Sequence, residues 1–167
     1  MSQVNTVLTE KLRAAVWDDA FWSRQIAQLI GPQPGAAALH LAVLVEPYLQ
    51  RVLDGLKTVE SRFAADRRAP YRQIAPDDLI LLKRSGGPIV GIAQVSDASF
   101  YELTPMMLGG IREQFEDGLG VSDQFFWEQR AHAAFATLLR MSHVRALAPI
   151  EFRKRDRRGW VILMPGR

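Results

Sequence analysis

Short segments of alternating apolar and polar residues, with helices inserted between them at irregular intervals, constrain the fold of this chain most strongly. Successive side chains of a strand point to opposite faces, so such alternation is typical of strands. A parallel doubly wound sheet requires regular strand–helix repetition, which this pattern lacks. We therefore expect an α+β fold, a small and mostly antiparallel β-barrel with inserted helices. The pattern predicts about six strands, at 39–45, 57–63, 79–83, 89–96 and 135–141 and in a final pair of segments at 150–152 and 160–163.

The first 35 residues differ in character from the rest of the chain. Their apolar residues recur at helical spacing in two stripes. The stripes consist of Leu8, Leu12 and Val16, and of Trp22, Ile26, Leu29 and Ile30. A Gly-Pro-Gln-Pro-Gly run at 31–35 interrupts any helix. We therefore expect an N-terminal helical extension at 1–35 and a barrel domain at 36–167. The extension either packs on the barrel or contacts a protein partner or a second copy of the chain.

Three further helices are expected between the strands. Proline in a first turn and glycine at an end delimit one of them at 47–55. Thr104 can cap a second helix, which the glycines at 109–110 weaken, so we expect it to be short. Ser122 can cap a third, which continues to about residue 130.

Composition restricts the classes of function. The chain of 167 residues has no cysteine, which excludes disulfides, thiolate nucleophiles and cysteine-rich zinc sites. It contains no apolar run of the roughly 20 residues that span a bilayer, so we expect no membrane segment. The lack of cysteine fits a reducing compartment, so we expect a cytoplasmic protein. The net charge of +3 hides an acidic segment at 97–128 and a basic one at 140–167. A basic face can bind an anionic polymer despite a modest total charge, although solvated loops are the simpler explanation of such clusters.

The segment 55–62 (Gly-Leu-Lys-Thr-Val-Glu-Ser-Arg) combines a lysine, a carboxylate and an arginine. On a strand, Thr58, Glu60 and Arg62 would share one face, and Lys57 would lie on the other. Lysine can contact a phosphate or, with its pKa lowered by burial, act as a base or nucleophile. Arginine can hold a phosphate or carboxylate with two parallel hydrogen bonds. An ordinary salt-bridged strand is the simpler alternative.

This segment resembles the Gly-x-Lys-x-x-Glu signature of the ASCH domains, a branch of the PUA-like barrels. The preceding helix at 47–55, the segments at 77–81 and 91–95 and the tail at 154–160 follow the order of that family. The resemblance spans roughly residues 39–164. It implies a cleft between the first barrel helix and the barrel that accepts RNA or a nucleobase-like group. The residues implied as ligand-binding are Tyr48, Lys57, Thr58, Glu60 and Arg62.

The same resemblance leaves enzymatic activity open. Some small relatives are amidohydrolases of N4-acylated cytidine that use a lysine, a threonine three residues later and a distant glutamate. In this chain Glu60 occupies the position of that threonine, and Thr58 comes two residues earlier. Another relative is a metal-dependent ribonuclease. If the chain is a hydrolase, Lys57 and Glu60 are its catalytic candidates.

Basic loops supply the candidate phosphate contacts. Arginine beside an aromatic ring can neutralise phosphate and stack on unpaired bases. Trp160 lies next to such a loop, although it also opens an apolar strand and is expected to belong to the core. The phosphate-contacting candidates are Arg67, Arg68, Arg155, Arg157 and Arg158.

We expect no metal site and no cofactor. The three histidines, His40, His132 and His143, do not have the spacing of metal ligands. The leading hypothesis is binding of RNA or a modified nucleotide through the signature, and the alternative is a hydrolase acting on a nucleoside or RNA.

Overall fold

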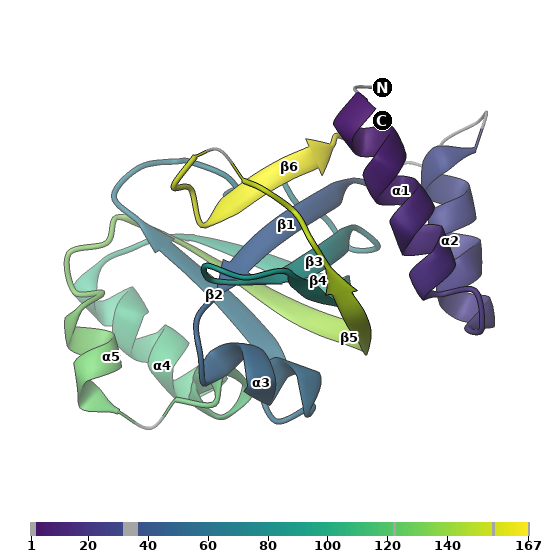
Figure 1. Ribbon diagram of the computed structural model, residues 1–167. Coiled ribbons are helices and arrows are strands. Elements are labelled where there is room, and N and C mark those ends of the chain that lie inside the picture. Colours follow the sequence, from purple (N-terminus) through teal and green to yellow (C-terminus); the bar gives the residue numbers. More distant parts are fainter. Residues whose placement is uncertain (1–2, 32–36, 122, 155, 167) are drawn as a thin grey trace.

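The computed structural model describes residues 3–31, 37–121, 123–154 and 156–166 (Figure 1). Its centre is one six-stranded sheet in the order β2-β5-β4-β3-β1-β6. Only β1 and β3 run parallel, and every other neighbouring pair is antiparallel. The sheet curls into a half-barrel with five helices around it, which confirms the expected α+β barrel fold. The strands are β1 (Leu39–Leu44), β2 (Val59–Ala64), β3 (Leu79–Arg84), β4 (Ile89–Glu102), β5 (Phe135–Ile150) and β6 (Trp160–Met164).

Two strands are longer than the sequence pattern predicts. β4 has 14 residues and β5 has 16, and their pairing contains three register shifts. Extra residues at such shifts bend a strand and increase its twist, which lets two long strands follow the curl of the sheet. The predicted separate strand at 150–152 is wrong, because β5 continues to Ile150 and residues 151–154 are irregular.

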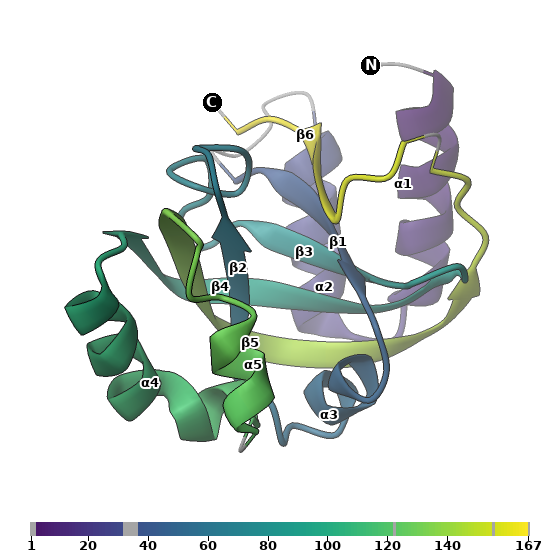
Figure 2. The same ribbon diagram turned by 90° about the vertical axis from the view of Figure 1, so that its left-hand side faces the viewer.

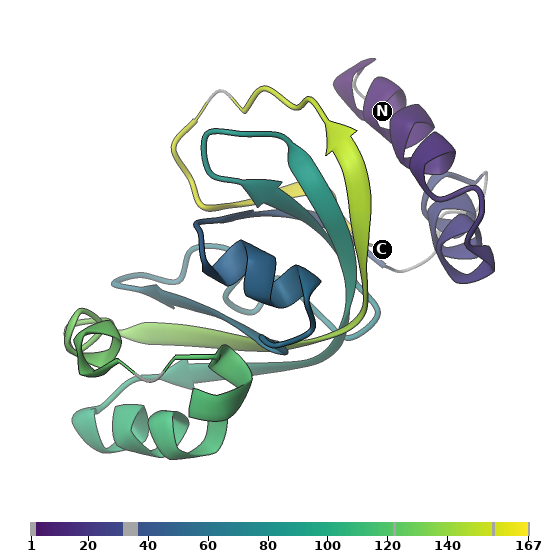
Figure 3. The same cartoon turned by 60° about the horizontal axis from the view of Figure 1, so that its bottom comes forward.

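The N-terminal helices form a hairpin that shares a core with the sheet. Leu12 and Trp22, one from each predicted stripe, are 0 % and 2 % exposed and pack in one cluster with Leu41 and Leu81 of the sheet. Figure 3 shows this hairpin on one side of the curled sheet and α3 on the other. The two predicted apolar stripes therefore pack against the sheet of the same chain. Contact of the hairpin with a partner or a second copy stays a prediction. The hairpin helices are α1 (Gln3–Ala15) and α2 (Ala20–Ile30), with Asp19 as the N-cap of α2.

The other helices lie on the opposite side of the molecule from the hairpin (Figure 2). The expectation of a short helix after Thr104 is wrong, because burial of Ile111, Phe115 and Leu119 outweighs the weak helical preference of its glycines. The expected cap Ser122 lies outside the described residues, and Asp123 caps the following helix. These helices are α3 (Tyr48–Leu53), α4 (Pro105–Leu119) and α5 (Gln124–Glu128).

A close approach joins α4 to the edge of the sheet. A Cβ atom on Gly118 would come within 2.7 Å of the Val59 side chain, so only glycine fits at this contact. The contact brings the C-terminus of α4 to the start of β2, where the signature residues lie. No described helix has the length and hydropathy needed to cross a membrane.

Candidate functional site

The turn between α3 and β2 determines where Lys57 lies. Gly55 has a φ of +73°, which a residue with a side chain rarely adopts, and the N–H groups of Leu56 and Lys57 both donate to the Arg51 carbonyl. β2 therefore begins only at Val59, and Lys57 and Thr58 precede it. The expectation that Lys57 points away from Glu60 is wrong for this reason, because strand alternation does not apply before the strand begins.

Lys57 is buried and fully paired. Its ammonium donates to the carbonyls of Val59 and, at 3.3 Å, Leu119, and it lies 3.4 Å from Glu60 Oε2. Three acceptors match the three N–H groups of an ammonium. Burial lowers the pKa of Lys57, while the Glu60 carboxylate acts in the opposite direction. Lys57 thus ties the end of α4 to the beginning of β2.

Glu60 and Arg62 share one face of β2, as the alternation predicts. Glu60 Oε1 lies 2.9 Å from Arg62 Nη2, and the Glu60 side chain is only 9 % exposed. The same Arg62 guanidinium extends across the open side of the half-barrel. There it donates to the carbonyls of Val43 at 3.1 Å and Gly159 at 3.2 Å. The buried Nε of Arg62 has no hydrogen-bond partner among the residues described.

A further cation, Arg130, joins this group from the segment after α5. Its guanidinium lies 3.4 Å from the ring centroid of Phe126 and donates to the carbonyl of the same residue at 2.6 Å. Burial lowers the pKa of Arg130, and the nearby Glu60 opposes that shift. Sequence reasoning missed Arg130, because no motif contains it and only the folding of α5 against β2 brings it here.

A pocket of about 350 Å³ opens beside Arg62. The Trp160 ring lies 5.1 Å from the Arg62 guanidinium, and Tyr71 and Phe135 form an edge-to-face pair at 5.0 Å. Tyr71 is 4 % exposed, yet its hydroxyl has no hydrogen-bond partner in the described chain. We call this the arginine–aromatic pocket; it is lined by Arg62, Phe63, Ala64, Arg68, Ala69, Pro70, Tyr71, Phe135, Thr137, Arg157, Arg158, Gly159 and Trp160.

The predicted phosphate contacts divide into three groups. Arg68, Arg157 and Arg158 line the arginine–aromatic pocket together with Arg62. Arg67 does not line it and pairs with Glu102 on the surface. Arg155 lies outside the described residues. Arg68 pairs with Asp66 and Arg158 with Asp156, whereas Arg157 forms no ion pair with any residue in the described part of the chain.

The remaining candidates lie at a distance from this pocket. Tyr48 is half-buried, and its ring centroid lies 6.0 Å from Lys57 Nζ. Thr58 is exposed, and its backbone pairs with Gly118 and Met141. Lys57 and Glu60 do not line the pocket but lie behind Arg62. The structure thus joins Lys57, Glu60 and Arg62 in one network, of which only Arg62 reaches the pocket.

Trp160 belongs to the core and also forms a wall of the pocket. Its indole N–H donates to His40 Nδ1 at 3.1 Å, so the other ring nitrogen of His40 carries the proton and donates to Asp78 Oδ2 at 3.2 Å. His40 is fully buried in this chain of contacts. Among the described residues, no three histidine, aspartate or glutamate side chains are grouped as metal ligands would be.

A family model for the ASCH domain matches residues 43–130, from β1 to the segment after α5. The chain therefore belongs to the ASCH domain family, a group of PUA-like fold that is thought to bind RNA. Lys57, Glu60, Arg62 and Arg130 lie within the match, whereas Trp160 lies outside it.

Solved ASCH structures share this fold at low sequence identity. The crystal structure of an ASCH protein from Zymomonas mobilis is 15% identical, with a TM-score of 0.62, and the alignment covers 75% of this chain and 87% of that one. A serine-to-alanine variant of the Zymomonas protein gives 15% identity and a TM-score of 0.62, over 77% of this chain and 90% of the other. No curated protein matches the chain significantly.

Proposed function

We propose that this protein binds single-stranded RNA by inserting an unpaired base into the arginine–aromatic pocket. The observation that carries the proposal is a pair of unmet hydrogen-bond donors in residues that line it. Tyr71 Oη and Arg62 Nε are both buried without a partner among the described residues. A buried polar group without a partner costs roughly 1–3 kcal/mol. A ligand that displaces the lining far enough to reach these two atoms recovers that free energy.

The chemistry of the lining suits a nucleotide. Unpaired bases stack on aromatic rings and on guanidinium planes, and each such contact contributes about 1–3 kcal/mol. Trp160, Tyr71 and Phe135 offer rings, and Arg157 offers a guanidinium that no described carboxylate neutralises. The volume of about 350 Å³ lies at the lower end of the roughly 300–1,000 Å³ typical of small-ligand pockets. One base with its sugar is therefore a suitable occupant.

The signature residues support this pocket from behind. Lys57 Nζ lies 3.4 Å from Glu60 Oε2, and Glu60 Oε1 lies 2.9 Å from Arg62 Nη2. A guanidinium fixed in this way loses little side-chain entropy when it binds a ligand. In this proposal Lys57 and Glu60 position Arg62 and do not contact RNA themselves.

A hydrolase is the second candidate, and one observation favours it. Burial lowers the pKa of Lys57, as a catalytic base requires. However, all three N–H groups of the Lys57 ammonium have acceptors, which hold its proton in place. Binding without turnover is therefore the better supported function. Hydrolysis of N4-acetylcytidine or of RNA that Lys57→Met abolishes, with the fold retained, would establish the enzyme instead.

The binding proposal is tested by removing one oxygen atom. We expect Tyr71→Phe to weaken binding of a labelled single-stranded oligouridylate about three- to tenfold in fluorescence anisotropy, the equivalent of one hydrogen bond. Tyr101→Phe is the matched control, because Tyr101 is half-buried on β4 and does not line the pocket. Equal affinities of the two variants and the wild type would contradict the proposal.

A further inference from the structure

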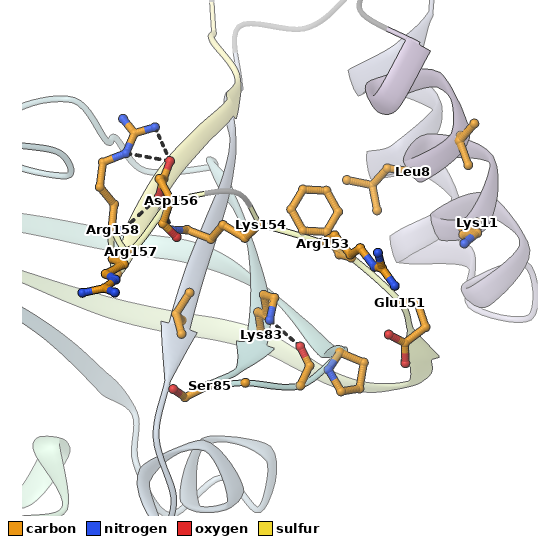
Figure 4. Close-up of a pocket in the computed structure, with 17 residues that line it drawn as sticks. Leu8, Lys11, Lys83, Ser85, Glu151, Arg153, Lys154, Asp156, Arg157 and Arg158 are labelled. Carbon is orange, nitrogen blue, oxygen red and sulfur yellow. Dashed lines mark hydrogen bonds and ion pairs between the residues drawn. The ribbon is translucent and has the colours of Figure 1, made fainter.

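A larger groove lies between α1, the turn joining β3 to β4, and the segment joining β5 to β6. Its volume is about 1450 Å³, above the roughly 300–1,000 Å³ of ordinary small-molecule pockets, so it has room for a ligand larger than one nucleotide. Figure 4 shows its labelled side chains gathered around one hollow, with Leu8 and Lys11 of α1 on one side. We call this the basic groove; it is lined by Val7, Leu8, Lys11, Val43, Lys83, Ser85–Pro88, Glu151–Lys154 and 156–159.

Lys83 is the most unusual residue of the basic groove. It occupies a strand whose preceding residues are all apolar, and it is 7 % exposed. Its ammonium donates to the carbonyls of Arg84, at 3.2 Å, and Gly87, and it forms no ion pair with a described carboxylate. One of its three N–H groups therefore has no partner in the described chain. A buried ammonium without a counter-charge is costly, which points to an anion as the missing partner.

The rest of the groove is positively charged as well. Six cationic side chains line it against two carboxylates. One of these carboxylates, Asp156, pairs with Lys154 and Arg158. No ion pair is found within the described residues for the other carboxylate, Glu151, or for the remaining cations, Lys11, Arg153 and Arg157. The groove thus keeps a surplus of positive charge that its own acidic groups do not neutralise.

The basic groove adjoins the arginine–aromatic pocket. Arg157, Arg158 and Gly159 line both, so the segment before β6 forms a wall common to the two. A ligand bound in the pocket can continue past these arginines into the groove without leaving the positively charged surface. Lys11 belongs to α1, so the N-terminal hairpin contributes to this continuous surface although it lies outside the ASCH match.

We infer that the basic groove holds the sugar–phosphate backbone of the RNA strand whose base occupies the pocket. The inference rests on the proposed function and specifies its ligand, a single-stranded RNA of several nucleotides in place of a free nucleoside. The N-terminal hairpin then has two roles, since it covers the sheet with its apolar side and contacts phosphate with Lys11.

The test compares a short and a long ligand. Dissociation constants are measured for a uridine dinucleotide by NMR titration and for a twelve-residue oligouridylate by fluorescence anisotropy, each at several salt concentrations. The variant is Lys11→Ala with Arg153→Ala, two exposed cations of the groove. The matched control is Arg13→Ala with Arg24→Ala, which removes the same charge from exposed positions of the hairpin that do not line the groove.

We expect the groove variant to bind the long oligonucleotide about tenfold more weakly and to lower its salt slope by about 1.4, the value for two lost phosphate contacts. The dinucleotide should bind the groove variant and the wild type equally. Lys83→Met should weaken the long ligand in the same way, and the control should behave as wild type.

Each other outcome has a distinct meaning. If wild type binds the long ligand but the groove variant matches the control, the groove inference is wrong and the pocket proposal stands. The same holds if the long ligand binds no tighter than the dinucleotide. If the groove variant has the expected effect but Tyr71→Phe has none, the basic groove binds RNA by itself, and both the pocket proposal and the inference of one site continuous with the pocket fail. If wild type binds neither ligand, both fail.

Discussion

The guanidinium of Arg62 lies 5.1 Å from the ring of Trp160, and this contact joins the two edges of the half-barrel. Arg62 belongs to β2 and Trp160 opens β6, the two strands at opposite ends of the sheet order. Because the sheet does not close through backbone pairing of β2 and β6, the side chain of Arg62 crosses the gap to the carbonyls of Val43 and Gly159. The last residue of the ASCH signature segment therefore stabilises the fold and faces the pocket at once.

Replacing this arginine with lysine tests its role in holding the two edges together. A lysine cannot reproduce the planar fork that reaches Glu60 and the two carbonyls together. We expect Arg62→Lys to lower the free energy of unfolding by about 1–2 kcal/mol in urea denaturation. Arg67→Lys should leave it unchanged, because Arg67 pairs with Glu102 on the exposed surface. Equal stability of the two variants would contradict this role.

The buried carboxylate of Glu60 should matter more than any surface ion pair. Its loss leaves Lys57 and Arg62 without their shared counter-charge, and breaking a buried pair on one side costs about 3–5 kcal/mol. We expect a loss of this order for Glu60→Gln, measured by thermal and urea unfolding. Glu102→Gln removes the carboxylate of an exposed pair and should change stability by less than about 0.5 kcal/mol. A similarly small change for Glu60→Gln would rule out the buried network as a source of stability.

Asp78 should contribute to the acid stability of the protein. Burial alone would raise the pKa of Asp78, but hydrogen bonds from His40, Ala38 and Ala75 outweigh it and lower the pKa below 3.8. A carboxyl group with a lowered pKa stabilises the fold fully above the unfolded value, and this contribution is lost as pH falls through the folded value. The free energy of unfolding should therefore decrease as the pH falls below about 3.8.

The Asp78→Asn variant should be less stable at neutral pH by about 1–3 kcal/mol, because its amide donors face other donors. It should also lose less stability between neutral and acidic pH than the wild type does. Asp117→Asn, at an exposed position of α4, is the control and should keep the acid dependence of the wild type. Parallel pH profiles for Asp78→Asn and the wild type would show that another group is responsible.

The N-terminal hairpin should be part of the cooperative fold. Trp22 is 2 % exposed in the core that the hairpin shares with the sheet, so Trp22→Ala should cost about 3–5 kcal/mol. Trp17 is 79 % exposed between the same two helices, and Trp17→Ala should cost less than about 0.5 kcal/mol. If Trp22→Ala unfolded the hairpin alone and left the barrel transition unchanged, the extension would be an independent unit.

Local patterns made the strands and the buried stripes predictable. Leu12 and Trp22 follow helical spacing, and Glu60 and Arg62 follow strand alternation, so their faces could be read without a structure. The face on which the Lys57 side chain lies could not be predicted, because the positive φ of Gly55 delays the start of β2 and strand alternation does not extend to Lys57.

The pocket could be predicted only in part. Arg157 and Arg158 were recognisable as basic residues beside an aromatic one. Tyr71 and Arg130 were not, because both lie in irregular segments whose positions depend on distant parts of the chain. The sequence shows Lys83 as a charged residue at the end of an apolar strand. Its burial could not be predicted, because it depends on the turn after β3.

Photocrosslinking tests the central claim most directly. A single-stranded RNA carrying 4-thiouridine is bound to the wild-type protein and irradiated, and the crosslinked peptides are identified by mass spectrometry. We expect crosslinks at Tyr71, Phe135 or Trp160, the rings of the arginine–aromatic pocket. Crosslinks confined to elements remote from the pocket and the basic groove, such as α2 or α4, would contradict RNA binding at this site.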